Sequence, residues 1–177
     1  MGVWIRPVGS QDVPVIREVQ RLSGDRFWEV GLGDVAISEP MSREQYETYA
    51  NAGRAWAAAD EATGVVGFVL VDEIDRAAHV EQVSVIPDRQ GQGIGRALIE
   101  HVEAWAIRRG LKGLTLTTFD HVPWNRPLYE HLGFRVLAEG EMSPGLRAIR
   151  ATEAAHGLDP ALRVAMFLSL LDGQEGE

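Results

Sequence analysis

Residues 80–95 read VEQVSVIPDRQGQGIG, an apolar segment of β character that runs into a turn rich in glycine. Residues 97–109, ALIEHVEAWAIRR, follow directly and have the apolar spacing of an amphipathic helix. The first amides of a helix lack acceptors within the helix, and the helix dipole favours negative charge at that end. A strand that passes through such a turn into a helix is therefore typical of a site for a phosphorylated ligand.

The spacing of the glycines distinguishes between the known types of phosphate-binding loop. Gly91, Gly93 and Gly95 occupy every second position, and Arg96 follows them. A dinucleotide fingerprint needs a third glycine three residues after the second, and a nucleoside-triphosphate loop needs Gly-Lys followed by Ser or Thr. The sequence contains neither pattern in this stretch. For the glycines alone, an ordinary strand-to-helix turn without a ligand is the alternative.

Composition narrows the class of protein. At 177 residues the chain is long enough to bury a substantial core. It has no cysteine, which excludes disulfides and a cysteine nucleophile, and its five histidines show no metal-site spacing, so we expect no metal. A net charge of −9 argues against a nucleic-acid partner and would attract cationic substrates such as amines.

Hydropathy and the chain ends suggest a location and a domain count. No run of 18 apolar residues is present, so we expect no membrane span. The first residues, MGVWIRPV, lack the apolar stretch of a secretory signal, and we expect a cytoplasmic protein. We expect one domain over residues 1–172 and a disordered acidic tail over residues 173–177.

Periodicity, capping residues and turn signals predict an alternating order of strands and helices. The predicted strands are residues 3–8, 54–60, 64–71, 79–86, 114–119, 134–138 and 162–171. The predicted helices are residues 14–24, 42–53, 94–109, 127–132 and 144–156. Ser10 and Asp12 are candidate caps of the first helix, and Ser42 with Gln45 forms a candidate capping box for the second. We expect an irregular segment over residues 25–40 and a polar turn over residues 72–78.

Two motifs occur together in the second half of the chain. Residues 90–95 have the form Gln-x-x-Gly-x-Gly, and residues 122–134, VPWNRPLYEHLGF, place Asn125 and Tyr129 four residues apart before Gly-Phe. This pair of motifs resembles the GNAT superfamily, the acetyl-coenzyme A-dependent N-acetyltransferases. The resemblance covers residues 80–138 well and the rest only by the order of elements. It implies an α/β (α+β) fold whose mixed, mostly antiparallel central sheet is flanked by helices and splayed between two central parallel strands, 79–86 and 114–119.

The resemblance also implies a site for acetyl-coenzyme A. The implied cofactor-binding residues are Val83, Val85, Gln90, Gly91, Gln92, Gly93, Ile94, Gly95, Arg96 and Asn125. The two valines would pair their backbone groups with the pantetheine arm, one amide lying near the thioester oxygen, although both also suit an ordinary core strand. The amides from Gln90 to Arg96 would hold the pyrophosphate, and Asn125 would hydrogen-bond the arm from the other side.

The implied catalytic residues are Tyr129 and Glu81. In the family pattern Tyr129 is the general acid near the cofactor sulfur, while packing of the short helix is its structural alternative. A lysine-like amine is neutral in only about one molecule in 2,500 at pH 7, so a base would help. Glu81 is the first candidate for this base, and His79, two residues earlier on the same strand face, is the second. A bound water, with Glu81 as a solvated strand residue, is the third alternative.

The predicted reaction is direct transfer of an acetyl group from acetyl-coenzyme A to a primary amine in a ternary complex. The acceptor is a small-molecule amine or a peptide amine that the sequence does not specify. Homodimers are common among similar proteins, but no feature of the sequence fixes the oligomeric state. A non-catalytic acyl-coenzyme A-binding module and a nucleotide-dependent enzyme are the alternatives. Phe27, Trp28 and Tyr46 belong to the region that covers the acceptor pocket in similar proteins, or pack an irregular loop.

Overall fold

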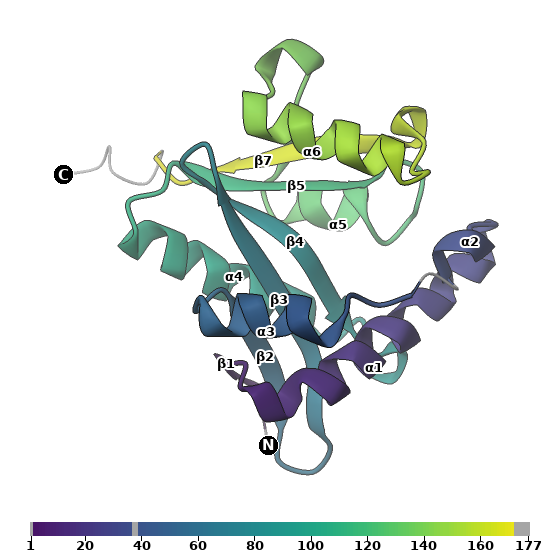
Figure 1. The fold of residues 1–177 in the computed structure, drawn as a ribbon, viewed down its shortest axis with the longest axis vertical. Helices are drawn as coiled ribbons and strands as arrows, with labels where there is room; N and C mark the ends of the chain where they lie inside the picture. The colour runs from purple at the N-terminus through teal and green to yellow at the C-terminus, as the bar shows by residue number, and fades with distance from the viewer. Residues whose placement is uncertain (1, 37–38, 172–177) are drawn as a thin grey trace. The chain divides into compact units, whose positions relative to one another are not determined.

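The structure is a computed structural model that describes residues 2–36 and 39–171 (Figure 1). Its strands are β1 (Trp4–Pro7), β2 (Ala55–Asp60), β3 (Gly64–Ile74), β4 (Ala77–Val85), β5 (Gly113–Phe119), β6 (Arg135–Val136) and β7 (Arg163–Ser169). Its helices are α1 (Val13–Gly24), α2 (Gly33–Ala36), α3 (Arg43–Asn51), α4 (Ile94–Arg108), α5 (Arg126–His131) and α6 (Pro144–Ala155). The order of elements is the predicted one except for α2, which lies in the segment that was expected to be irregular, residues 25–40. The acidic tail predicted over residues 173–177 lies outside the described residues.

The strands form one seven-stranded sheet in the order β1-β2-β3-β4-β5-β7-β6. The pairs β1–β2, β2–β3, β5–β7 and β6–β7 are antiparallel, whereas β4 and β5 are parallel. The predicted mixed, mostly antiparallel sheet is therefore confirmed. The β4–β5 ladder consists of Ala78 opposite Leu114 and His79 opposite Thr115. The described residues of the second unit that follow His79 in β4 do not pair with β5, as the predicted divergence of the two strands requires.

The chain divides into two compact units. The first comprises Met1–Val71 and Gln82–His101, and the second comprises Asp72–Glu81 and Val102–Glu177. Strands β3 and β4 and helix α4 each contribute residues to both units. The single domain expected over residues 1–172 stays a prediction.

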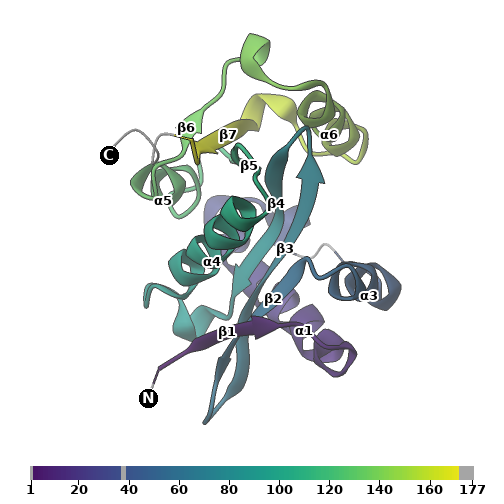
Figure 2. The same cartoon turned by 90° about the vertical axis from the view of Figure 1, so that its left-hand side faces the viewer.

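In the first unit, α1 and α3 lie on one side of β1, β2 and β3, and α4 lies on the other (Figure 2). The buried residues of the core under α1 and α3 are Val8, Val13, Ile16, Val19, Tyr46, Ala55, Ala57, Phe68 and Leu70. Side chains alternate between the faces of a strand. Trp56 of β2 therefore points away from this core, and its ring lies 5.2 Å from the ring of His101 in α4. Helices thus cover both faces of this part of the sheet.

The capping box predicted for α3 is present. The Ser42 hydroxyl accepts a hydrogen bond from the Gln45 amide at 3.2 Å, and the Gln45 side chain accepts one from the Ser42 amide at 2.8 Å. Two amides at the start of the helix that would otherwise lack partners are satisfied in this way. The boundary of α3 was therefore readable from the sequence.

Asp12 precedes α1, but its carboxylate does not cap the helix. It accepts two hydrogen bonds from the Arg6 guanidinium, at 2.7 and 2.9 Å, and one from the Gly9 amide at 2.8 Å. Asp12 thus occupies the predicted N-cap position of α1, but its side chain makes no capping bond to that helix, because the bidentate Arg6 engages the carboxylate. The bonds from Arg6, more than that from Gly9, hold the pKa of Asp12 below its usual value.

Replacing Asp12 with asparagine is expected to lower the free energy of unfolding by about 1–3 kcal/mol at pH 7, because Arg6 and Gly9 lose a charged acceptor. Since the pKa is lower in the folded state, this stabilisation is complete above about pH 4 and is lost as the pH falls through the folded-state value. Urea unfolding of both proteins between pH 7 and pH 3 tests this. A difference between the proteins that does not narrow towards pH 3 would contradict the assignment.

The connection between β3 and β4 differs from the sequence expectation. A polar turn was expected over residues 72–78, but β3 continues to Ile74 and β4 starts at Ala77. Only Asp75 and Arg76 form the turn, with φ values of 50° and 64°. Tight hairpins require such left-handed residues, and glycine or asparagine normally signals them. The Asp75 carboxylate also accepts a hydrogen bond from the Gly145 amide at 2.7 Å, which ties the turn to the start of α6.

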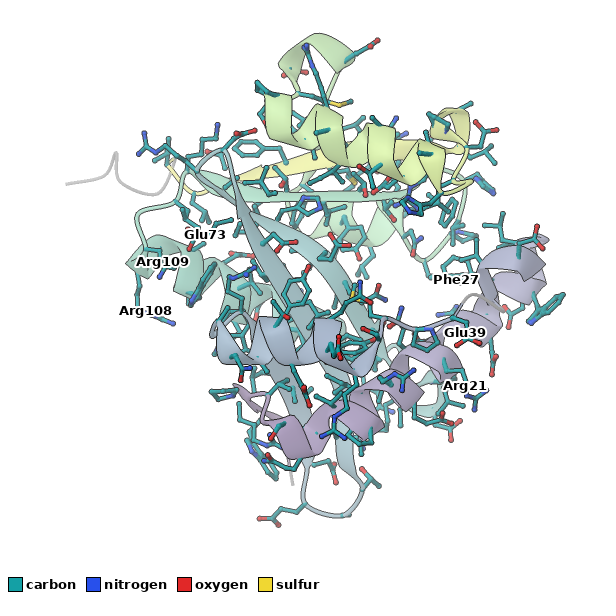
Figure 3. All side chains as sticks on the ribbon, viewed as in Figure 1. Arg21, Phe27, Glu39, Glu73, Arg108 and Arg109 are labelled. Carbon is teal, nitrogen blue, oxygen red and sulfur yellow. The ribbon has the colours of Figure 1, made fainter. Side chains whose placement is uncertain are left out.

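In the second unit, α5 and α6 lie on opposite sides of β5 and β7 (Figures 1 and 2). Helix α6 packs through Leu146 against Leu137 and Ala165, with Phe167 at the edge of this cluster. At the end of α4, Arg109 forms an ion pair with Glu73 of β3, and Figure 3 shows the two side chains together. No helix in the described ranges is both long enough and apolar enough to cross a membrane.

Candidate functional site

The glycine loop presents an uninterrupted series of free backbone donors. Gly91 and Gly93 have φ values of 76° and 81°, a left-handed conformation that glycine adopts without strain. The amide of Gln90 donates to Pro87 at 3.2 Å, and that of Ala97 donates to Gly93 at 3.0 Å. Among the described residues, the six amides between them, from Gly91 to Arg96, donate to no protein acceptor. Consecutive free amides at the start of a helix form a site for an anion.

Gln90 anchors the loop through its side chain. Its Nε2 donates to the Val85 carbonyl at 2.9 Å, and its Oε1 accepts from Arg26 Nη1 at 2.6 Å. The backbone amide of Gln90 is already engaged by Pro87. Within the predicted set, Gln90 therefore holds the end of β4 and the 3-10 helix Asp25–Val30 to the loop, and the free amides begin one residue later.

The arginines of the loop are paired with carboxylates. Arg89 Nη2 lies 3.1 Å from Asp60 Oδ2, and Arg89 Nε donates to Gln92 Oε1 at 3.0 Å. Arg96 Nε lies 2.9 Å from Glu100 Oε1 on the exposed side of α4. The capacity of the loop to bind an anion therefore comes first from its backbone amides and only then from its cationic side chains.

Val83 and Val85 direct their backbone groups away from β3. The Ile86 amide donates to the Val66 carbonyl of β3 at 2.9 Å, and the Ser84 carbonyl lies 2.9 Å from where a Cβ on Gly67 would stand. Because backbone groups alternate between the two edges of a strand, the odd-numbered residues of β4 face the opposite edge. The Val85 carbonyl on that edge already accepts the Gln90 side chain.

His79 and Glu81 lie side by side on the part of β4 that belongs to the second unit. His79 is 1% exposed, its Nδ1 is 2.9 Å from Thr115 Oγ1, and its Nε2 is 3.7 Å from Glu81 Oε2. Burial lowers the pKa of His79, so its ring is neutral at pH 7. The Glu81 side chain is 34% exposed, which leaves one edge open to solvent.

The environment of Glu81 makes it a stronger base than an ordinary glutamate. Burial, more than any other factor, raises the pKa of Glu81 to about 7. The negative charges of Asp72 and Glu153 act in the same direction, while Arg163 opposes them. A carboxylate with this pKa changes its protonation state near neutral pH, as a general base requires.

Asn125 and Tyr129 both carry side-chain polar groups for which the described part of the chain provides no hydrogen-bond partner. Asn125 occupies the N-cap of α5, but its carboxamide makes no capping bond to the helix. The Tyr129 ring packs edge-on against Phe134 at 5.8 Å, and its hydroxyl has no hydrogen-bond partner among the described residues. Burial raises the pKa of Tyr129 to about 12, so the hydroxyl keeps its proton at neutral pH.

The predicted residues lie in three places: the loop with the end of β4, the part of β4 that holds His79 and Glu81, and helix α5 with its N-cap. The first unit holds Val83, Val85 and the loop, whereas Glu81 and Tyr129 belong to the second unit. Glu81 lies on β4, whereas Tyr129 lies on α5. Tyr46 is buried in the core and donates a hydrogen bond to Gln20, so the packing interpretation holds for it.

Sequence reasoning missed Glu153 and Arg163. Glu153 lies on α6 and Arg163 begins β7, far along the chain from Glu81. Only the pairing of β5 with β7 and the packing of α6 bring them to Glu81, and a single sequence shows neither. The alternation of threonines in β5 was the one available signal that this strand has a polar face.

Comparison with known proteins finds relatives whose sequences match part of this chain and solved structures whose folds match nearly all of it. N-alpha-acetyltransferase 80 of Mus musculus is 38% identical over 85 residues, which cover 46% of this chain and 25% of that protein. Thialysine N-epsilon-acetyltransferase of Mus musculus is 32% identical over 81 residues, which cover 44% of this chain and 46% of that protein. The chain thus spans less than half the length of either relative.

Solved structures match the fold over nearly the whole chain. The ribosomal-protein-S18-alanine N-acetyltransferase from Escherichia coli has a TM-score of 0.67 at 17% identity and covers 99% of both chains. The PaiA N-acetyltransferase from Thermoplasma acidophilum, in complex with coenzyme A, has a TM-score of 0.68 at 15% identity and covers 96% of this chain and 99% of that one. At such identities the likeness shows the fold alone.

The family assignment rests on a longer match. Residues 24–134 match the acetyltransferase (GNAT) family, and this stretch takes in the glycine loop, Asn125 and Tyr129. With more than half of its length matched and its fold shared with N-acetyltransferases, the chain belongs to the acetyltransferase (GNAT) family.

Proposed function

We propose that the chain is an N-acetyltransferase that transfers an acetyl group from acetyl-coenzyme A directly to a primary amine. The observation that carries this proposal is the run of six free amides from Gly91 to Arg96, which suits a pyrophosphate. Family membership supports the same ligand. Because the chain has no cysteine, a ternary complex accounts for the transfer better than a covalent cysteine intermediate.

The residues present fit acetyl-coenzyme A. Its pyrophosphate would accept hydrogen bonds from the amides of the loop. Its pantetheine arm would pair with the backbone groups of Val83 and the amide of Val85, and the carboxamide of Asn125, which makes no capping bond, is a further hydrogen-bonding group for the arm. When bound, it supplies the acetyl group as a thioester, which is the electrophile of the reaction.

Three groups of the chain would carry the chemistry. Glu81 accepts a proton from the attacking amine, directly or through a water. An amide at Val83 or Val85 donates to the carbonyl oxygen as negative charge develops on it. Tyr129 donates a proton to the departing sulfur. The new N–C bond and the broken C–S bond are thereby balanced by one proton taken up and one released.

The raised pKa of each catalytic group has a separate consequence. A glutamate with a pKa near 7 is closer to the pKa of about 10.4 of an alkylamine than an ordinary glutamate is, which reduces the cost of taking the proton. The raised pKa of Tyr129 makes transfer to a thiolate, with a pKa of about 8.5, unfavourable before the C–S bond weakens. Tyr129 therefore releases its proton only as charge builds on the sulfur.

Replacing Glu81 with glutamine is expected to reduce kcat/KM by about 100-fold at pH 7.5, a typical contribution of a general base. In the wild-type protein the pH dependence of kcat/KM should show an inflection near pH 7 as Glu81 loses its proton, and in the variant this inflection should vanish. Steady-state kinetics between pH 5.5 and 9 with one amine acceptor measures both. Glu18→Gln, which removes an exposed carboxylate of α1, is the matched control.

An unchanged pH profile in Glu81→Gln would reject Glu81 as the base and leave His79 and a bound water as the alternatives. His79 stands second, because burial lowers its pKa and its Nδ1 is engaged with Thr115. His79→Gln tests that alternative in the same assay.

The acceptor is proposed only as a class, a primary amine of a small molecule or of a peptide. The partial relatives carry names that specify an N-alpha amine and thialysine, which are both amines. Release of free thiol from acetyl-coenzyme A should therefore accelerate with an amine panel, and mass spectrometry should find an acetylated acceptor. Saturable cofactor binding without turnover on peptide N-termini, lysine-like amines and polyamines would favour the non-catalytic acyl-coenzyme A-binding module.

A further inference from the structure

One face of the sheet in the second unit carries a polar network that the proposed reaction does not use. Residues two apart on a strand share a face, and residues directly opposite each other on neighbouring strands do as well. His79 pairs with Thr115, and Phe119 pairs with Arg163. Glu81, Thr117 and Arg163 therefore lie on the same face. Helix α6 covers this face, because its Leu146 packs against Ala165 of β7.

Glu153 of α6 is fixed to this face from two sides. The Thr117 hydroxyl donates to its Oε1, and Arg163 Nε donates to its Oε2 at 3.0 Å. Arg163 Nη2 also lies 3.1 Å from Thr117 Oγ1, and its guanidinium stacks over the Phe119 ring at 4.6 Å. The side chains of Arg163 and Glu153 are 11% and 18% exposed. Two opposite charges are thus held in fixed positions, and little water screens them.

Thr117 is the residue that Glu81 would face if the β4–β5 pairing continued past His79 and Thr115. The carboxylate of Glu153 is therefore bonded to the residue that follows Thr115 on the face of β5 shared with His79 and Glu81. Four charged or titratable groups act on Glu81 from the surrounding elements: Asp72 of β3, His79 of β4, Glu153 of α6 and Arg163 of β7. Because His79 is neutral, the charges that shift the pKa of Glu81 are those of two carboxylates and one guanidinium.

We propose that Glu153 is a positioning residue that controls the pH at which Glu81 ionises, through a charge held in place by Thr117 and Arg163. This role of Glu153 affects catalysis if Glu81 is the base, and so it rests on the proposed function. Without Glu153, only Asp72 would oppose the guanidinium of Arg163, and Glu81 would lose its proton at lower pH and bind it more weakly. Without Arg163, the two carboxylates would keep Glu81 protonated at neutral pH.

The direct test is a titration of the Glu81 side-chain carboxyl by ¹³C NMR, on the full chain without cofactor, with Glu81 assigned from the Glu81→Gln spectrum. In Glu153→Gln, the glutamine keeps the shape and the acceptor for Thr117 but loses the charge. The midpoint of Glu81 should fall by about half a pH unit or more. In Arg163→Met it should rise, and in Arg163→Lys, which keeps the charge, it should move less.

Glu141→Gln is the matched control, because Glu141 is also paired with an arginine in the second unit, Arg135, but is exposed. Its effect on the midpoint should be negligible. Far-UV circular dichroism confirms that each variant is folded. If Glu153→Gln does not fold, the opposite shift expected for Arg163→Met carries the test. A midpoint of Glu81 that stays in place in both folded variants would overturn the proposal.

The kinetic profile separates this proposal from the proposed function. If Glu81 is the base, the acidic limb of kcat/KM should follow the NMR midpoint in each variant. A midpoint that moves while the limb stays in place would uphold the control of Glu81 by Glu153 and reject Glu81 as the base. The NMR result stands whether or not the amine panel contains the acceptor.

Discussion

Replacing Gly93 with aspartate is expected to weaken the binding of coenzyme A by at least about 100-fold, or ~2.7 kcal/mol. Gly93 lies in the middle of the six free amides, and a Cβ there would meet no protein atom. A carboxylate at this position would face the pyrophosphate, and two like charges about 4 Å apart at a protein surface repel each other by several kcal/mol. Isothermal titration calorimetry at low salt measures the loss.

Two further variants isolate the charge from the backbone strain. Asparagine and aspartate both tolerate the left-handed conformation, with φ of 81°, better than other side chains. Gly93→Asn should therefore lose far less affinity than Gly93→Asp. Gly110→Asp introduces the same residue at another glycine with positive φ, 69°, at the end of α4, and should not change the affinity for coenzyme A. Equal losses in Gly93→Asn and Gly93→Asp would mean that strain or bulk at Gly93, and not the repulsion between charges, explains the result.

Tyr129→Phe is expected to reduce kcat by about 100- to 1,000-fold, the usual contribution of a general acid, with little change in cofactor affinity. The reason is that the hydroxyl has no partner among the described residues, whereas the ring packs against Phe134. Phenylalanine keeps that packing and removes only the donor. Pre-steady-state kinetics with a saturating amine should show that the acetyl-transfer step itself slows.

Tyr49→Phe is the control for the same chemical change. The guanidinium of Arg54 lies 5.3 Å from the centre of the Tyr49 ring, an interaction that phenylalanine preserves. Its kcat should stay within about twofold of the wild type, as is usual for changes away from the reacting atoms. A Tyr129→Phe protein with the same kcat as Tyr49→Phe would mean that water or another group protonates the leaving sulfur.

The parts of the fold that rest on local chemistry could be predicted from the sequence. The Ser42 capping box and the end of α4 before Gly110 follow from residues that lie close together in the chain, whereas the mixed sheet was implied by the resemblance to the GNAT superfamily. The turn between β3 and β4 could not be predicted, because Asp75 and Arg76 take a left-handed conformation without glycine or asparagine to signal it. Within the irregular segment of residues 25–40, the 3-10 helix Asp25–Val30 and α2 have no strong periodicity of their own.

The site divides in the same way. The glycine loop and the Asn125–Tyr129 pair are contiguous motifs. The structure adds that, among residues 2–36 and 39–171, the amides of Gly91–Arg96, the Asn125 carboxamide and the Tyr129 hydroxyl have no protein partner. The raised pKa of Glu81 could not be predicted from the sequence, because it depends on burial and on the charges of Glu153 and Arg163. These residues reach Glu81 through the pairing of β5 with β7 and through α6. Gln90 also has a structural role, as an anchor bonded to Arg26, that its place in the motif did not indicate.

The binding of acetyl-coenzyme A by the amides of Gly91–Arg96 is the claim on which the other proposals depend, and ¹H–¹⁵N NMR of the full chain tests it most directly. Titration with coenzyme A should shift these six amide resonances together, with saturation at one ligand per chain, while the Gly110 amide stays in place. ATP and NAD should produce weaker shifts. Saturable binding of coenzyme A that leaves these six amides unchanged would contradict the account.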